Sequence, residues 1–220
     1  MAIDLWFEEL AVTDEEYRHY WPLLDKNEQD KALRFVQTTH GRRYIASHGK
    51  LRLILSEYLG IPPAKIGYTE QAFGKPVIII DGLEHDIKFN MAHSGNKMLV
   101  AVGMDCEIGV DIEVWNGGID TLSIANICFA EAERCFWNEL PENRKNEFFY
   151  RFWTRKESFV KAVGVGLGLD VSCVVSSHEG ATRFLSVPDG YGCAGDWALV
   201  DLDFGSGISA ALTVSTKCYI

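Results

Sequence analysis

The chain has 220 residues, enough to bury a substantial core as one domain or as two small lobes. Hydrophobic residues make up 47% and charged residues 24%, which is ordinary for a globular protein in water. The formal net charge of −10 argues against nucleic acid as a partner, because proteins that bind it normally present a basic surface. No apolar run approaches the roughly 18 residues of a membrane span, and the N-terminus lacks the basic start of a signal peptide. We therefore expect no membrane partner and a cytoplasmic location.

The pattern of cysteines also favours a cytoplasmic location. They are scattered, with no C-x-x-C pair and no histidine pair at zinc spacing. We predict that they are reduced and form neither a structural disulfide nor a zinc site. They are Cys106, Cys128, Cys135, Cys173, Cys193 and Cys218.

The first half of the chain predicts strands around three helices. After an N-terminal strand, Thr13 begins a helix as a capping residue followed by acids in the first turn. A longer helix is ended by Gly60 and the two prolines that follow. Helices are predicted near 14–21, 27–36 and 41–58, and strands near 3–7, 65–69, 77–80, 88–92 and 98–102.

The second half repeats this order of strand, helices and strands. We predict a strand around Asp111, helices over 124–127, 131–140 and 142–163, and strands over 171–176, 197–202 and 208–214. One long helix with several strands in each half indicates an α+β fold. No low-complexity linker separates the halves, so two lobes must pack tightly. We place the lobes at residues 1–105 and 106–220.

A local basic strip interrupts the acidic chain. Between Lys31 and Arg52 there are six basic residues, two histidines and no acid. Such a strip indicates a specific anionic ligand, and the alternative is a solvated helix face.

Three carboxylates and a lysine form the most informative pattern. Asp111 and Glu113 alternate with apolar residues, so both point to one side of a strand, and Gly109 leaves that side open to a bulky neighbour. Glu157 and Lys161 are four residues apart on a helix and share a face. If the helix packs beside the strand, the group suits Mg²⁺ and a phosphate-bearing ligand. The alternatives are a solvated strand face and a surface ion pair.

A series of short segments resembles the Sfp-type 4′-phosphopantetheinyl transferases. The segments stand in the family's order and approximate spacing: Phe73-Gly74-Lys75-Pro76, Phe89 to Gly95, Ile108 to Glu113, Phe152 to Ala162, and Gly164 to Leu167. The resemblance implies two similar, tightly packed lobes related by a pseudo-twofold axis, each a small antiparallel sheet with a long helix. It also implies transfer of phosphopantetheine from coenzyme A to a serine of an acyl or peptidyl carrier protein.

The resemblance also implies roles for individual residues. Asp111, Glu113 and Glu157 match the family's Mg²⁺ ligands, with Mn²⁺ as a possible substitute, and Asp111 belongs to the coenzyme A site as well. Glu157 matches the residue that helps to deprotonate the carrier serine, directly or through water. Lys161 matches the lysine that contacts the phosphates and offsets developing negative charge.

Further residues match contacts to the phosphates of coenzyme A. His93 matches the histidine near the 3′-phosphate, and Ala92 departs from the family, which usually has serine there. The remaining contacts are assigned to Lys31, Arg34, Arg43 and Lys75, with Arg42 replacing Arg43 if the register slips by one.

Two further interpretations concern the long helix. We interpret Trp153 as a core residue that faces the Asp111 strand. Carrier proteins are acidic, so an enzyme at −10 needs a local basic patch, and Arg151, Arg155 or Lys156 could supply it.

The predicted protein is a monomeric, Mg²⁺-dependent transferase whose products are holo-carrier protein and adenosine 3′,5′-bisphosphate. Two alternatives remain open. One is an unrelated metal-dependent phosphohydrolase that uses the same acids, and the other is a catalytically dead homologue that binds carrier proteins.

Overall fold

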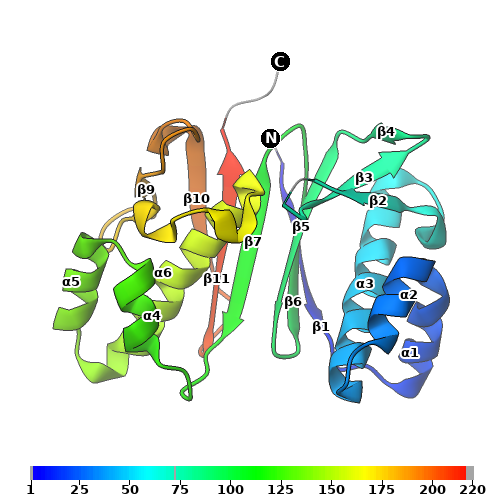
Figure 1. The fold of residues 1–220 in the computed structure, drawn as a ribbon, viewed down its shortest axis with the longest axis horizontal. Helices are drawn as coiled ribbons and strands as arrows, with labels where there is room; N and C mark the ends of the chain where they lie inside the picture. Colours follow the sequence, from blue (N-terminus) through cyan, green and yellow to red (C-terminus); the bar gives the residue numbers. More distant parts are fainter. Residues whose placement is uncertain (1, 72, 217–220) are drawn as a thin grey trace.

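The structure is a computed structural model that describes residues 2–71 and 73–216, so Cys218 lies outside the described residues. It has four layers, in the order helix, sheet, sheet, helix (Figure 1). The two sheets lie against each other in the middle, α3 covers one outer face, and α6 covers the other (Figure 1). The predicted α+β fold of two tightly packed lobes is confirmed.

The N-terminal lobe contains a three-stranded antiparallel sheet with the order β1-β6-β5. A second small sheet, β2-β3-β4, lies beside it. The elements are β1 (Asp4–Glu9), α1 (Asp14–Tyr20), α2 (Lys26–Leu33), α3 (Thr38–Leu59), β2 (Gly67–Glu70), β3 (Pro76–Ile80), β4 (Leu83–Glu84), β5 (Ile87–Ser94) and β6 (Lys97–Met104).

The predicted helix start at Thr13 and helix end at Gly60 are both found in the structure. Thr13 caps α1 in a capping box with Glu16, and Gly60 ends α3 in the left-handed region at φ 65°. The two-residue strand β4 is a strand that the pattern did not predict.

The C-terminal lobe contains the antiparallel sheet β10-β11-β7 and the short pair β8-β9. The elements are β7 (Ile108–Val114), α4 (Thr121–Cys128), α5 (Glu131–Glu139), α6 (Glu142–Val163), β8 (Val175–Ser176), β9 (Phe184–Ser186), β10 (Trp197–Leu202) and β11 (Ile208–Ser215). The strand predicted over 171–176 is mostly wrong. Its first residues, Val171–Cys173, form a 3₁₀ turn capped by Asp170, and only two residues pair as β8.

The core between the two sheets joins the lobes. Apolar residues of β5 and β6, such as Ala92 and Leu99, pack against Val110 and Ile112 of β7 and Leu212 of β11. A second core lies between α3 and the outer face of its sheet, and a third lies between α6 and the opposite outer face. Each of the two central sheets therefore has apolar packing on both of its faces.

The strands β5 and β7 meet along one edge of this sandwich. The Asn90 side-chain oxygen accepts the Val110 N–H at 2.9 Å, and the Ser94 hydroxyl accepts the Val114 N–H at 3.1 Å. From the first hydrogen bond to the second, the chain advances four residues on each strand, from Asn90 to Ser94 and from Val110 to Val114. The two strands therefore run parallel, and these side chains bridge them. This edge is the lobe interface nearest to the predicted site.

Within residues 2–71 and 73–216, the structure has no helix that is both long and apolar enough to cross a membrane. Four of the described cysteines, Cys128, Cys135, Cys173 and Cys193, are free thiols.

Candidate active site

Helix α6 lies directly on strand β7 because Gly109 has no side chain. A Cβ built on Gly109 would lie 2.1 Å from the Ser158 carbonyl oxygen and 2.3 Å from the Ala162 nitrogen. The bulky neighbour that Gly109 admits is therefore the α6 backbone itself. A hydrogen bond of 2.7 Å between the hydroxyls of Ser158 and Thr213 also fastens α6 to β11. The helix that carries Glu157 and Lys161 is thus fixed against the strand that carries the acids.

Asp111 and Lys161 form the centre of the site. The Lys161 ammonium donates to Asp111 Oδ1 at 2.6 Å, and Asp111 is only 4% exposed. Burial raises the pKa of Asp111 to about 7, against the lowering effect of Lys161, and the charges of Glu113 and Glu157 raise it further. Asp111 Oδ2 is buried and has no hydrogen-bond partner within the described part of the chain.

Glu157, on helix α6, is influenced by the same two charged neighbours, Lys161 and Glu113. Its pKa is raised mainly by burial, is lowered by Lys161, and is raised again by the charge of Glu113. The three carboxylates therefore interact electrostatically, as the periodicity of strand and helix predicted. The alternatives of a solvated strand face and a surface ion pair do not describe Asp111, which is buried.

Glu113 lies at the half-buried end of β7 and is held from the other lobe. The Ser94 hydroxyl donates to Glu113 Oε2 at 2.7 Å. The sequence patterns did not predict a role for Ser94 or Asn90. The signal that could have indicated them was their polar character close to the apolar residues Phe89, Met91 and Ala92 of β5.

His93 lies on β5 near these charges and is partly open to solvent. Atoms packed around the ring lower the pKa of His93, the positive charges of Lys161 and His48 lower it further, and Glu113 opposes them. A neutral imidazole is therefore favoured until a negatively charged group approaches it.

Two pockets flank the site. One, of about 610 Å³, lies between the lobes. Its walls include Phe73, Lys75, Asn90 and Met91 from the N-terminal lobe, and Ile127, Trp153, Glu157, Val160 and Lys161 from the C-terminal lobe. The other, of about 550 Å³, is lined by Ser94, Glu113, Trp115, Ile119, Tyr150 and Trp153.

Trp153 lines both pockets and is half-buried. The interpretation of Trp153 as a core residue is therefore wrong. The reason is the helical twist, which puts Trp153 one turn before Glu157, on the helix face that borders the pockets.

Among residues 2–71 and 73–216, no group of three or more His, Cys, Asp or Glu is placed so that it could hold a metal ion as the structure stands. Lys161 forms an ion pair with one carboxylate oxygen of Asp111 in this structure. The buried and unpartnered Asp111 Oδ2, beside two further carboxylates, is the kind of oxygen that a hard cation binds. The predicted ligand set of Asp111, Glu113 and Glu157 stays a prediction.

Lys75 reaches the end of α6. Its ammonium donates to Glu107 at 2.9 Å and to the Ala162 carbonyl oxygen at 2.6 Å. Lys75 thus links the turn before β3 to the residue that follows Lys161, while it also lines the larger pocket.

The other predicted phosphate contacts have different neighbours in the structure. Arg43 donates to the Asn96 side chain at 2.7 Å, in the β5–β6 turn that follows His93 and Ser94. Arg42 instead pairs with Asp14 at 2.7 Å, so Arg43 is the arginine nearer to the site. The Lys31 ammonium lies over the Tyr44 ring at 5.4 Å, and Arg34 is exposed just after α2.

The basic strip between Lys31 and Arg52 is not a single binding face. Lys50 pairs with Glu8 at 2.7 Å, and the fully buried Arg52 pairs with Asp25 and Glu28. Together with Arg42, these residues hold the N-terminal helices in place, because α3 turns its successive basic residues toward different neighbours.

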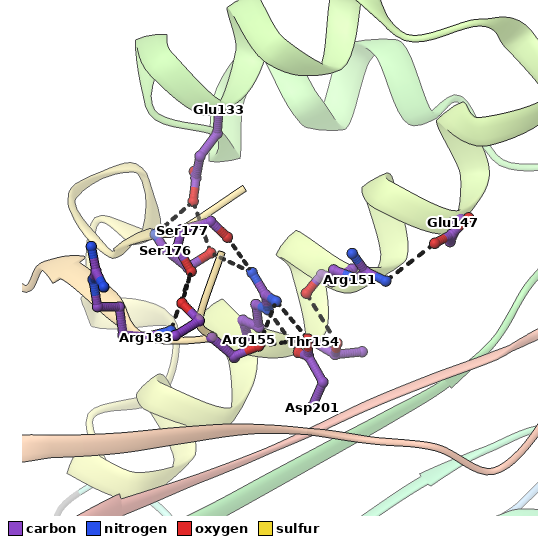
Figure 2. A network of polar contacts seen from close by, with 11 residues as sticks. Glu133, Glu147, Arg151, Thr154, Arg155, Ser176, Ser177, Arg183 and Asp201 are labelled. Atoms are coloured by element: carbon purple, nitrogen blue, oxygen red, sulfur yellow. Dashed lines mark hydrogen bonds and ion pairs between the residues drawn. The ribbon is translucent and has the colours of Figure 1, made fainter. Parts of the chain in front are cut away.

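Two of the three residues proposed for a carrier-binding patch are buried. Arg155 is 3% exposed and binds Asp201 through two hydrogen bonds, of 2.7 and 2.5 Å, as well as the Ser177 carbonyl oxygen (Figure 2). Lys156 is fully buried and pairs with the equally buried Glu133 at 2.7 Å. Burial lowers the pKa of Lys156, and the charge of Glu133 opposes this.

The docking hypothesis is therefore wrong for Arg155 and Lys156, because these long side chains tie α6 to α5 and to the β8 region. Arg151 alone reaches the surface, where it pairs with Glu147 at 3.1 Å (Figure 2).

Both halves of the chain match known proteins. Residues 107–199 match the model of the 4′-phosphopantetheinyl transferase superfamily, and residues 9–104 match that of the 4′-phosphopantetheinyl transferase N-terminal region. The 4′-phosphopantetheinyl transferase HetI of Nostoc sp. is 33% identical over 165 residues, which cover 75% of this chain and 70% of that protein. A 4′-phosphopantetheinyl transferase of Bacillus subtilis is 30% identical over 164 residues, which cover 74% of this chain and 70% of that protein.

The chain belongs to the 4′-phosphopantetheinyl transferase superfamily. The resemblance and the prediction of an enzyme of this class are both confirmed.

Proposed function

We propose that this protein transfers the 4′-phosphopantetheine group from coenzyme A to a serine of an acyl or peptidyl carrier protein. The observation that carries the proposal is the convergence of Asp111, Glu113, Glu157 and Lys161 beside a pocket formed by both lobes. The products are holo-carrier protein and adenosine 3′,5′-bisphosphate. The protein acts as a monomer in the cytoplasm, and the free thiols support that compartment.

Asp111, Glu113 and Glu157 would hold Mg²⁺, with Mn²⁺ as a possible substitute. When bound, the cation neutralises negative charge on the pyrophosphate as the phosphoanhydride breaks. Lys161 adds a positive charge at the same place, and Asp111 keeps that ammonium oriented through their ion pair of 2.6 Å.

Glu157 would accept the proton of the carrier serine, directly or through water. Its raised pKa makes it a better base than an ordinary carboxylate at neutral pH. The serine oxygen bonds to the phosphorus that carries the pantetheine. The bond from that phosphorus to the bridging oxygen breaks, and adenosine 3′,5′-bisphosphate leaves with the electron pair.

His93, Lys75, Arg43, Lys31 and Arg34 are proposed as contacts to the remaining phosphates. His93 and Arg43 are supported by their positions on β5 and next to the β5–β6 turn. Lys75 is supported by its place in the wall of the larger pocket.

Mass spectrometry of an apo-carrier incubated with the protein, coenzyme A and Mg²⁺ tests the function. We expect one serine to gain the mass of one phosphopantetheine arm. Cleavage of coenzyme A at the same rate without carrier would indicate a phosphohydrolase instead, and carrier binding without any mass gain would indicate a catalytically dead homologue.

Glu157→Gln tests the catalytic assignment. We expect turnover to fall about 10²- to 10⁴-fold, because general-base catalysis contributes on this order. Glu147→Gln is the matched control, since Glu147 lies on the same helix but pairs with Arg151 outside the site. Equal turnover of the two variants would contradict the role of Glu157.

A further inference from the structure

Ser94 makes two hydrogen bonds whose directions are determined by its chemistry. The Val114 N–H can only donate, so the Ser94 oxygen accepts it at 3.1 Å. The single hydroxyl proton is then directed to Glu113 Oε2, 2.7 Å away. The hydroxyl rotor of Ser94 is thereby locked, and Glu113 receives a hydrogen bond from a fixed donor.

This contact crosses from one lobe to the other. Ser94 is the last residue of β5 in the N-terminal lobe, and Glu113 is the next-to-last residue of β7 in the C-terminal lobe. The bond from the Val114 N–H anchors Ser94 to the backbone next to Glu113. The Glu113 carboxylate is therefore oriented by the same Ser94 side chain that links β5 to β7.

The other two acids are oriented differently. Asp111 is buried and paired with Lys161, and Glu157 is carried by a helix that packs on Gly109. Glu113 is half-buried near the end of its strand, where a carboxylate without a partner rotates freely. A hydrogen bond to one oxygen keeps the second oxygen in a defined direction.

We propose that Ser94 is a positioning residue that orients Glu113 for a divalent cation and ties the geometry of the acids to the lobe interface. This inference rests on the proposed function, which assigns Glu113 to the metal. In this proposal Ser94 acts through Glu113, to which its hydroxyl donates.

Mn²⁺ binding to the free protein, measured by electron paramagnetic resonance, tests the inference without reference to turnover. We expect Ser94→Ala to bind Mn²⁺ about 10- to 100-fold more weakly than wild type, because removal of a partner of a metal ligand typically costs that much. Ser94→Thr keeps the hydroxyl and should restore most of the affinity.

Ser56→Ala is the matched control, since the Ser56 hydroxyl donates to the Leu53 carbonyl oxygen of its own helix at 2.7 Å. Its Mn²⁺ affinity should equal that of wild type. A merely structural role of Ser94 would lower the unfolding temperature of Ser94→Ala without changing Mn²⁺ affinity. A double variant of Ser94→Ala with Glu113→Gln should bind no more weakly than Glu113→Gln alone, because Ser94 acts through Glu113.

The outcomes separate the inference from the function on which it rests. If wild type binds no Mn²⁺, or if Glu113→Gln binds like wild type, the metal assignment fails and the inference fails with it. If Glu113→Gln is weakened and Ser94→Ala matches Ser56→Ala, only the positioning role of Ser94 is overturned.

Discussion

At the scale of single residues, Asp111 is a buried carboxylate whose charge is only partly compensated. A carboxylate with 4% exposure is costly to ionise, and the Lys161 ammonium offsets only part of that cost, so the pKa of Asp111 stays raised at about 7. The neighbouring charges of Glu113 and Glu157 add repulsion that a divalent ion would remove.

The raised pKa of Asp111 predicts how stability depends on pH in the absence of metal. Between the ordinary pKa of 3.8 and about 7, the folded protein keeps a proton on Asp111 that the unfolded chain has released. The free energy of unfolding contributed by this group therefore falls as pH rises through that window. Asp111→Asn removes the effect, so its unfolding temperature relative to wild type should be higher at pH 8 than at pH 5 in chelator.

The exposed Asp189 provides the control, because Asp189→Asn should show the same difference from wild type at both pH values. Added Mg²⁺ should stabilise wild type more at pH 8 than at pH 5, since the cation binds the ionised carboxylate. An Asp111→Asn difference that is constant with pH would contradict the prediction.

At the scale of elements, the contact between α6 and β7 determines where Glu157 and Lys161 lie relative to Asp111. Helix and strand approach so closely that backbone atoms of Ser158 and Ala162 occupy the space beside Gly109. Backbone atoms cannot rotate away as a flexible side chain can, so the whole helix must move if this space is filled.

Gly109→Ala should therefore shift α6 and weaken the fold. We expect a loss of about 1–3 kcal/mol or more in the free energy of unfolding, the usual range for overpacking, together with a fall in transferase turnover. Chemical denaturation measures the first effect. Gly195→Ala is the control, because a Cβ at Gly195 meets no atom within 4 Å among the described residues beyond its chain neighbours. Equal stability of the two variants would mean that α6 accommodates the methyl group.

At the scale of the whole molecule, both lobes line the larger pocket beside the acids. Each lobe has a three-stranded antiparallel sheet and a 22-residue helix, and the sheets pack face to face (Figure 1). We place the lobe boundary in the connection between Met104 and Ile108, which joins the two sheets. Asn90, Ser94 and Lys75 make polar contacts from the N-terminal lobe to the C-terminal lobe.

Lys75 provides the test at this scale. Lys75→Met should lower the free energy of unfolding by about 1–3 kcal/mol in the absence of ligands, since Glu107 and the Ala162 carbonyl oxygen lose their shared donor. Chemical denaturation of the free protein measures this loss. Lys65→Met is the control at an exposed lysine. If both variants unfold alike while coenzyme A affinity falls only in Lys75→Met, the residue contacts phosphate and does not strengthen the interface.

The amino-acid sequence by itself determined which side chains within one element share a direction. The period of two in β7 put Asp111 and Glu113 on one side, and the spacing of four in α6 put Glu157 and Lys161 on one face. These are local relations, since backbone geometry alone determines which neighbouring side chains share a direction. The repeated order of elements likewise predicted the two lobes.

Only the tertiary structure decided which distant groups meet. Lys161 pairs with Asp111 across 50 positions, Ser94 with Glu113 across 19, and Lys75 with Ala162 across 87. The burial of Arg155 and Lys156 could not be predicted from the sequence either. A charged residue on a helix gives the same sequence pattern whether it faces water or a buried acid. Packing of the sheets and helices sets these distances, and no short-range pattern encodes them.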